Sequence, residues 1–199
     1  MFAEEITNEE IKNLPLVQFT GKIFIVDSPQ KVELFTELIK NQPIIGIDTE
    51  TKPSFKKGAK NPVSLLQIAT LNQAFLFRIN LIGLPDSVIP LFENPDIKKI
   101  GLALKDDINI LKQIKHFNPA GFIDLQHYVK AFGIKSTSLK KIMAIIFGQR
   151  ISKSQQVTNW DRPELTEAQQ VYAATDAWAC FQIYKELNNQ LQKIKPNNL

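Results

Sequence analysis

Five side chains with the potential for chemistry come from three widely separated segments of the chain. They are Asp48, Glu50, Asp107, Tyr172 and Asp176. The four carboxylates fall in or beside apolar segments that we expect to be buried, and a buried carboxylate is costly unless a positive charge neutralises it. Because hard divalent cations prefer carboxylate oxygens as ligands, this pattern favours a site for a pair of divalent metal ions.

The first two acids close an apolar run at residues 44–47 that is typical of a buried strand. Side chains two residues apart in a strand point to the same side, so Asp48 and Glu50 face one way and Thr49 the other. Gly46 precedes them on their face and leaves open space beside the backbone. Taken alone, the triplet is better explained as a strand end that runs into solvent. A functional role for these acids is nevertheless favoured because α/β sheets place ligand sites at strand ends.

The third acid needs separating from its neighbour. On the helix expected over residues 104–114, Asp107 falls on the same face as Leu104 and Leu111, whereas Asp106 points roughly the opposite way. We interpret Asp106 as a solvated acid in the first turn, where it complements the helix dipole. Asp107 must then be paired, protonated or linked to a metal, and the chain shows no obvious local Arg or Lys partner.

The last two side chains are four residues apart and lie on one side of a long helix. Alanines around them, such as Ala173 and Ala177, are small enough for a strand to approach closely. A structural role is open for both: Asp176 could accept a hydrogen bond from a buried hydroxyl, and Tyr172 could be ordinary core. Three segments that each bring acids to a buried face nevertheless favour a functional site.

The elements that must position these residues alternate between strands and helices. We expect strands at residues 22–26, 44–48, 63–70, 74–77, 98–101 and 122–123, with the third and fourth forming a hairpin. We expect helices at residues 29–40, 87–93, 104–114, 125–131, 139–148 and 166–191, the last opened by a capping box. This order predicts one α/β domain, residues 22–191, with a mixed central sheet flanked by helices. An N-terminal arm (1–21) and a C-terminal tail (192–199) complete the chain.

Composition narrows the class of protein. Of 199 residues, 44% are hydrophobic and 22% charged, as in a globular protein with a real core. The net charge of +4 permits a polyanionic partner without requiring one. The first 13 residues carry four glutamates and no signal-peptide core, no apolar run reaches the ~20 residues of a membrane span, and the single cysteine, Cys180, excludes an internal disulfide. We expect a cytoplasmic protein without membrane contact.

Three segments resemble the motifs of the DEDD superfamily of 3′-5′ exonucleases. The first is residues 46–50 (GIDTE) with 64–69 (SLLQIA), the second 100–107 (IGLALKDD) and the third 172–177 (YAATDA). The second motif places its aspartate at Asp107. The third resembles the tyrosine branch, DEDDy, which includes ribonuclease D and the Werner syndrome protein exonuclease. Residues 159–166 (NWDRPELT) are similar to the run before the last helix in those members. The sister branch has a histidine five residues before the last aspartate, where this chain has Val171.

The resemblance implies a ribonuclease H-like fold and a 3′-5′ exonuclease that hydrolyses phosphodiester bonds at the 3′ end of nucleic acid and releases 5′-mononucleotides. It implies that Asp48, Glu50 and Asp176 hold one Mg²⁺ or Mn²⁺, that Asp48 bridges to a second ion, and that Asp107 reaches the second ion through water. Tyr172 would orient the attacking water, because an unperturbed phenol with a pKa of about 10 is a poor base.

Substrate contacts are expected from the strand and loop beside the acids. Gln67 lies on the neighbouring strand, and four lysines fill the loop: Lys52, Lys56, Lys57 and Lys60. We expect Gln67, Lys56, Lys57 and Lys60 to bind substrate, although a lysine-rich loop is equally well explained as solvated. Phe55 could stack on a base or simply pack or lie exposed. Either DNA or RNA with a free 3′ end fits, and the alternative to an enzyme is a nucleic-acid-binding scaffold that has lost turnover.

Overall fold

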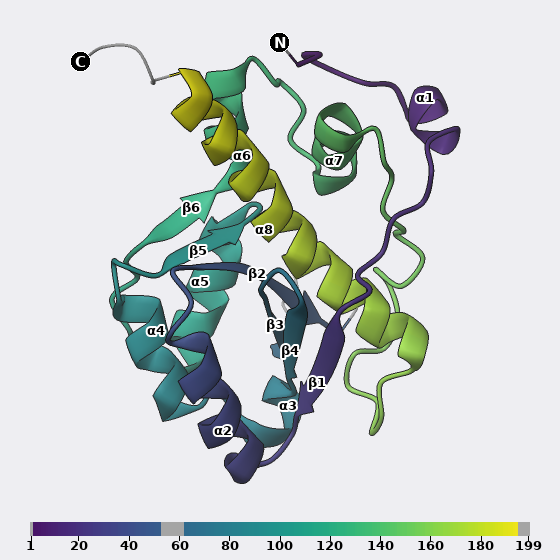
Figure 1. The fold of residues 1–199 in the computed structure, drawn as a ribbon. Coiled ribbons are helices and arrows are strands. Elements are labelled where there is room, and N and C mark those ends of the chain that lie inside the picture. Colours follow the sequence, from purple (N-terminus) through teal and green to yellow (C-terminus); the bar gives the residue numbers. More distant parts are fainter. Residues whose placement is uncertain (1, 53–61, 195–199) are drawn as a thin grey trace, which may run out of the picture.

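Helices cover both faces of a single central sheet in the computed structural model (Figure 1). The structure describes residues 2–52 and 62–194. Its strands are β1 (Lys22–Val26), β2 (Ile44–Thr51), β3 (Val63–Ala69), β4 (Gln73–Phe77), β5 (Lys98–Gly101) and β6 (Phe122–Asp124). They lie in the order β1-β4-β3-β2-β5-β6. The pairs β2–β3 and β3–β4 are antiparallel, and the pairs β1–β4, β2–β5 and β5–β6 are parallel. The predicted mixed sheet is confirmed.

Eight α-helices lie within the described residues. They are α1 (Asn8–Lys12), α2 (Pro29–Ile39), α3 (Ile79–Ile82), α4 (Ile89–Glu93), α5 (Leu104–Ile114), α6 (Leu125–Tyr128), α7 (Leu139–Phe147) and α8 (Glu167–Ile194). Two 3₁₀ turns, η1 (Asp86–Val88) and η2 (Val129–Phe132), precede α4 and follow α6. No helix in these ranges is both long and apolar enough to cross a membrane.

Several boundaries differ from the sequence prediction, and α8 runs to Ile194, three residues beyond its expected end. The helix expected over residues 125–131 is only one α-helical turn that continues as η2. The strand expected to stop at residue 48 runs on to Thr51 because β3 pairs with it throughout. The N-terminal arm contains α1, which a capping box between Thr7 and Glu10 starts and the buried side chain of Ile11 anchors. Glu50 therefore lies inside the strand with Asp48, where the prediction ended the strand at Asp48.

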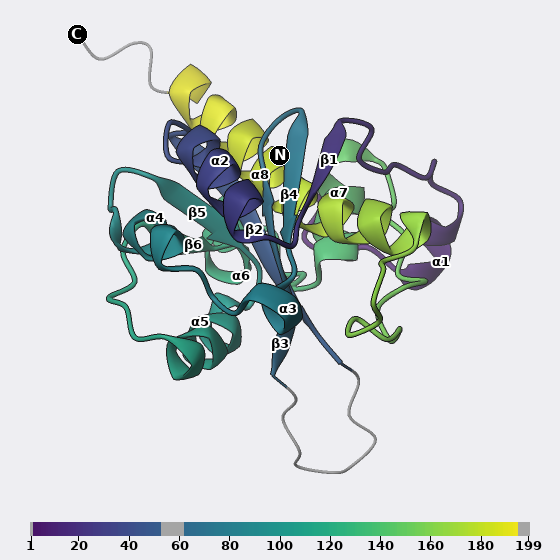
Figure 2. The ribbon, with the colours of Figure 1, turned by 90° about the horizontal axis from the view of Figure 1, so that it is seen from below.

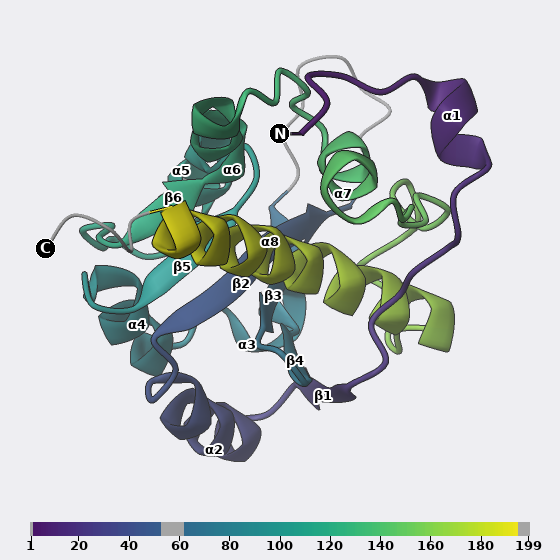
Figure 3. The same ribbon diagram turned by 45° about the horizontal axis from the view of Figure 1, so that its top comes forward.

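The two faces of the sheet have different covers. One face packs against α2, α4 and α5 through a large aliphatic and aromatic core. The other packs against α8, which crosses the strands as a single long helix (Figure 3). A side chain on Gly46 would place its Cβ 1.9 Å from the carbonyl oxygen of Ala177, so only glycine lets β2 and α8 approach this closely. In the view from below, α4 and α5 lie on one side of the molecule and α7 and α1 on the other (Figure 2).

Candidate active site

Carboxylates from β2 and α8 meet where the strand passes under the helix. One ligand oxygen each from Asp48, Glu50 and Asp176 lies within 4.8 Å of the others. Asp48 and Glu50 are half-buried and Asp176 is buried. The cluster borders a hollow of about 210 Å³, the acid pocket, whose walls include Tyr172 and Leu139. The structure thus brings together three of the four acids that the sequence singles out.

Three carboxylates this close cannot all be ionised without a cation. Burial raises the pKa of Asp48 well above its usual range, and the charges of Asp176 and Asp107 raise it further. Burial raises the pKa of Glu50 to about 9, and the negative charge of Asp48 is the second cause of this rise. Burial also raises the pKa of Asp176, against the opposing effect of a nearby lysine. The cluster is therefore poised to exchange protons for metal ions.

That lysine is Lys153, which the sequence analysis missed. Its Nζ lies 2.8 Å from Asp176 Oδ2 and donates to it, and lies 3.4 Å from the Tyr172 hydroxyl. The ammonium also sits 5.3 Å from the centre of the tyrosine ring. The only signal in the sequence was the position of Lys153 in the irregular stretch before the last helix. Spacing along a loop does not reveal which lysine folds back onto an acid.

The donor set fits a hard divalent cation. One lysine does not neutralise three carboxylates, and oxygen ligands are those that Mg²⁺ and Mn²⁺ prefer. The second oxygen of Asp176, Oδ1, is buried without a hydrogen-bond partner among the described residues. Since an unsatisfied buried oxygen is costly, a metal ion is a natural partner for it.

Asp107 lies beside the cluster but outside the group of three. Its Oδ1 accepts a hydrogen bond of 2.5 Å from the hydroxyl of Thr49, the residue between the two strand acids. Burial raises the pKa of Asp107 to about 6, and the Thr49 bond opposes that rise. The local partner that the sequence did not reveal is thus a hydroxyl. A water-mediated link from Asp107 to a metal remains a prediction.

Tyr172 is buried beside the acids and rests against the indole of Trp160, with 6.0 Å between the ring centres. Burial and the neighbouring carboxylates, first Asp176 and then Glu50, raise the pKa of its hydroxyl above the usual value. The phenol therefore stays protonated at neutral pH, so it can orient a ligand by hydrogen bonding but cannot act as a general base.

Contacts far apart in sequence fix the start of α8. The guanidinium of the buried Arg78 donates to the carbonyls of Arg162 (2.6 Å) and Pro163 (3.1 Å). The hydroxyl of Ser64 donates to Asp161 at 2.6 Å. These bonds hold the loop that leads into the helix, and the predicted capping box of Thr166 and Gln169 is present. Arg78 is a positioning residue that periodicity could not have indicated.

The expected substrate-binding residues fare differently. Gln67 is fully buried opposite Asp48 in the β2–β3 pairing, and neither polar atom of its amide has a partner among the described residues. Its side chain lies in the interior between the sheet and α8 and has no exposed surface, and its expected role in substrate binding stays a prediction. The other expected contacts lie outside the described residues: Phe55, Lys56, Lys57 and Lys60. Lys52 is described, with its Nζ 3.9 Å from Asp161.

Comparison with known proteins points in one direction. A family model described as 3′-5′ exonuclease matches residues 23–192. The bifunctional 3′-5′ exonuclease/ATP-dependent helicase WRN of Mus musculus is 28% identical over 187 residues, which cover 89% of this chain and 13% of that protein. Ribonuclease D of Shewanella sp. (strain ANA-3) is 26% identical over 184 residues, covering 91% of this chain and 45% of that protein. The chain therefore spans less than half the length of these relatives.

Solved structures agree with the topology. The crystal structure of the Nibbler EXO domain of Aedes aegypti matches with a TM-score of 0.76 and 26% identity, over 87% of this chain and 90% of that one. The ribonuclease H-like fold expected from the sequence motifs is thus confirmed.

Proposed function

Since this chain belongs to the 3′-5′ exonuclease domain family, we propose that it removes nucleotides one at a time from the 3′ end of a nucleic acid. The observation that carries the proposal is the cluster of Asp48, Glu50 and Asp176 oxygens within 4.8 Å of one another, next to the Tyr172 hydroxyl. An inactive scaffold would have no need to retain a set of acids so costly to bury.

The reaction is hydrolysis of the last phosphodiester bond. The oxygen of a water molecule forms a bond to phosphorus, and the bond from phosphorus to the 3′ oxygen of the preceding nucleotide breaks. That oxygen takes up a proton and becomes the new 3′ hydroxyl, while the product leaves as a nucleoside 5′-monophosphate. The proposed substrate is therefore any strand, DNA or RNA, with a free 3′ end.

The carboxylates would hold two ions of Mg²⁺ or Mn²⁺. Asp48, Glu50 and Asp176 supply the direct ligands, with Asp107 acting through water. When bound, the two ions stabilise the attacking and leaving oxygens and lower the pKa of a bound water. This assignment rests on the oxygen donor set, on the unpartnered Oδ1 of Asp176 and on the resemblance of the three motifs.

Tyr172 would act on the attacking water, and two further side chains hold Tyr172 in place. Tyr172 holds its proton and would donate a hydrogen bond that fixes the attacking water in line with the leaving oxygen. Lys153 contacts both Tyr172 and Asp176 and so keeps the phenol and the carboxylate in a fixed relation. Trp160 supports the ring of Tyr172 from behind.

Release of 5′-mononucleotides from matched DNA and RNA strands, single-stranded and with recessed 3′ ends, tests the proposal. We expect release with Mg²⁺ or Mn²⁺ and none in EDTA. No release with either metal, while the strand still binds, would support the scaffold instead. Within the site, Asp107→Asn should lower the rate by about 10–100-fold, as for other groups that hold a metal indirectly, whereas Asp106→Asn on the exposed side of α5 should not.

A further inference from the structure

A second hollow, of about 310 Å³, adjoins the acid pocket and has the opposite charge. We call it the cationic hollow. Its lining consists of Lys12, Lys140, Arg150, Ile151, Ser152 and Lys153. Four of these six residues carry a positive charge and none carries a negative one. Such a lining selects for an anion.

The hollow is built by segments distant in sequence. The N-terminal arm is joined to the loop after α7 by backbone hydrogen bonds: Arg150 N donates to the Pro15 carbonyl and Val17 N donates to the Arg150 carbonyl, both at 2.9 Å. Arg150 Nε donates to the Leu14 carbonyl at 3.0 Å. This seam brings Lys12 to the loop and gives the arm, which precedes the matched family range, a place in the site.

Two of the four cations are available to a ligand. Lys140 and Arg150 form no ion pair with any carboxylate within residues 2–52 and 62–194, and the terminal nitrogens of Arg150 have no hydrogen-bond partner there. The other two are engaged: Lys12 lies 2.8 Å from Glu9, and Lys153 lies 2.8 Å from Asp176. Lys140 and Arg150 are both half-buried, so less ordering entropy opposes binding than at fully exposed lysines.

The cationic hollow and the acid pocket share a wall. Lys153 lines both, and the adjacent residues Leu139 and Lys140 at the start of α7 line one each. A polyanion that presents one phosphate to the acids must pass its neighbouring charges over the surrounding surface. In cleavage from a 3′ end, every remaining phosphate lies on the 5′ side of the one being cut.

We propose that the cationic hollow binds the backbone phosphate on the 5′ side of the scissile one, with Arg150 and Lys140 as its principal contacts. The inference rests on the proposed function, because it names where the uncleaved strand runs. Phosphate contacts of this kind position a strand without reading its sequence, and arginine offers a planar pair of donors that suits phosphate oxygens.

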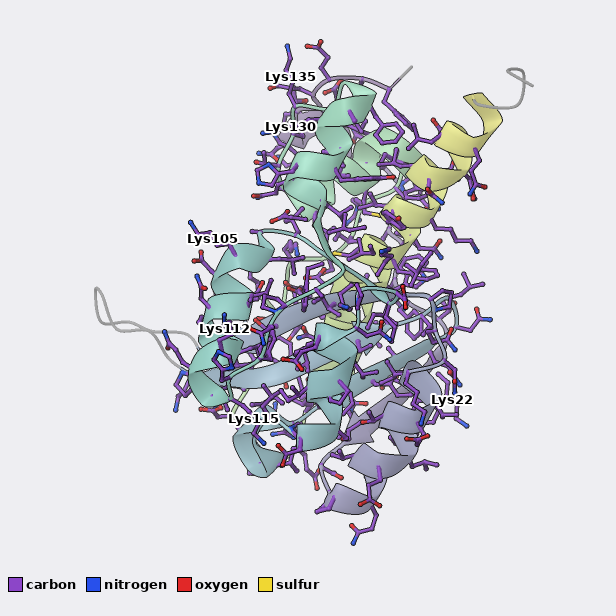
Figure 4. All side chains as sticks on the ribbon, turned by 90° about the vertical axis from the view of Figure 1, so that its left-hand side faces the viewer. Lys22, Lys105, Lys112, Lys115, Lys130 and Lys135 are labelled. Carbon is purple, nitrogen blue, oxygen red and sulfur yellow. The ribbon has the colours of Figure 1, made fainter. Side chains whose placement is uncertain are left out.

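Equilibrium binding of a fluorescein-labelled single-stranded oligodeoxynucleotide in EDTA tests the proposal without cleavage. Anisotropy is measured over a series of salt concentrations for the whole chain and for Lys140→Gln, Arg150→Gln and the pair. The matched control is Lys112→Gln on α5 (Figure 4). This helix packs into the core with α2 and α4, whereas α7 packs with α8 on the other face of the sheet. An RNA strand of the same sequence forms a second arm.

Each substitution in the hollow should weaken binding several-fold and reduce the slope of log K against log salt, and the pair should reduce it by about 0.7, the value for one phosphate contact on a single strand. Lys112→Gln should match the wild-type slope. Because Arg150 also holds the arm, Lys140→Gln, whose side chain makes no hydrogen bond within the described ranges, is decisive if Arg150→Gln unfolds.

Equal slopes for the wild type and Lys140→Gln, or an equal loss in Lys112→Gln, would overturn the proposal. Its failure is separable from that of the proposed function. If the wild type releases nucleotides but the hollow variants bind with the wild-type salt slope, only the phosphate site is refuted. A lowered slope in a protein that releases nothing would refute only the exonuclease.

Discussion

The two faces of the sheet differ in the size and polarity of the side chains that they bury. On the face that meets α2 and α4, Phe24, Phe35 and Phe75 form a ring cluster with centres 4.7 to 5.5 Å apart. On the face that meets α8, alanines and Gly46 replace bulky side chains, and Gln67 and Asp176 are buried with unsatisfied polar atoms. The first face is packed with large apolar side chains. The second has small side chains that let β2 and α8 approach closely, and it contains buried charge.

The two faces contribute to the free energy of folding with opposite sign. A buried aromatic cluster contributes through apolar area removed from water and through ring contacts. Carboxylates held together in a low dielectric cost free energy until a cation arrives. We therefore expect substitutions on the aromatic face to change stability alone, and substitutions on the α8 face to change chemistry, sometimes with a gain in stability.

The largest effect should come from Asp48→Asn. Removing a direct metal ligand forfeits several kcal/mol of transition-state stabilisation, so nucleotide release should fall at least about a thousandfold. The folded protein without metal should melt no lower than wild type, because one like charge has gone. Asp106→Asn is the matched control and should keep full activity. A variant that unfolds, or that stays active, would break the contrast between the faces.

On the aromatic face, Phe75→Ala should lower the free energy of unfolding by about 3–5 kcal/mol. Its fully buried ring packs against Phe24 and Phe35, and Phe75 does not line the acid pocket. Urea denaturation measures the loss, and kcat of the folded fraction should match wild type. The exposed Leu34→Ala should change stability by less than about 0.5 kcal/mol. A large fall in kcat would show that the two faces are coupled.

Gly46→Ala should lower both the stability of the fold and the activity. The new methyl would lie 1.9 Å from the Ala177 carbonyl, so β2 and α8 must separate at the point where they share the acids. We expect a loss of about 1–3 kcal/mol from overpacking and a fall in activity approaching about a hundredfold from misplaced ligands. Unfolding and rate measurements on the same preparation check it. Wild-type values for both would mean that the approach of helix and strand is not needed.

In EDTA, stability should fall as pH rises. The folded pKa of Glu50 is about 9, against 4.5 for an ordinary glutamate, so the folded protein keeps a proton that the unfolded chain loses between these values. The free energy of unfolding therefore declines across pH 4.5 to 9, and Mg²⁺ or Mn²⁺ should offset the decline. Glu50→Gln should make the decline shallower in EDTA, and the part that remains belongs to Asp48, Asp107 and Asp176, whose pKa values are also raised. A flat profile in the wild type would contradict buried charge on the α8 face.

The smallest effect should come from Lys153→Met. The ammonium lies 2.8 Å from Asp176 Oδ2 and would compete with a metal ion for that oxygen. Its removal should therefore tighten Mn²⁺ binding several-fold, as measured by electron paramagnetic resonance titration. Lys153→Arg keeps the charge and should bind Mn²⁺ like wild type, and Lys112→Met controls for distant charge. Weaker Mn²⁺ binding in Lys153→Met would mean that the lysine supports the metal site.

Local pattern was enough for much of the fold. The bounds of α5, the capping box at Thr166 and the shared direction of Asp48 and Glu50 all follow from periodicities of 3.6 and 2 or from short-range hydrogen bonds. What the local pattern did not show depends on distant parts of the chain. Gln67 was placed on the correct strand, but its burial depends on α8, which lies about a hundred residues further along the chain.

The sequence by itself determined which residue types are available, which element carries each, and which way the acids point from β2, α5 and α8. These properties depend on neighbours within a few residues, which can be read directly from the sequence. Only the tertiary structure decided that Lys153 covers Asp176, that Thr49 bonds Asp107, that Trp160 supports Tyr172 and that the N-terminal arm closes a cationic hollow. Each of these contacts depends on how loops and helices pack across the sheet, and no local spacing encodes that.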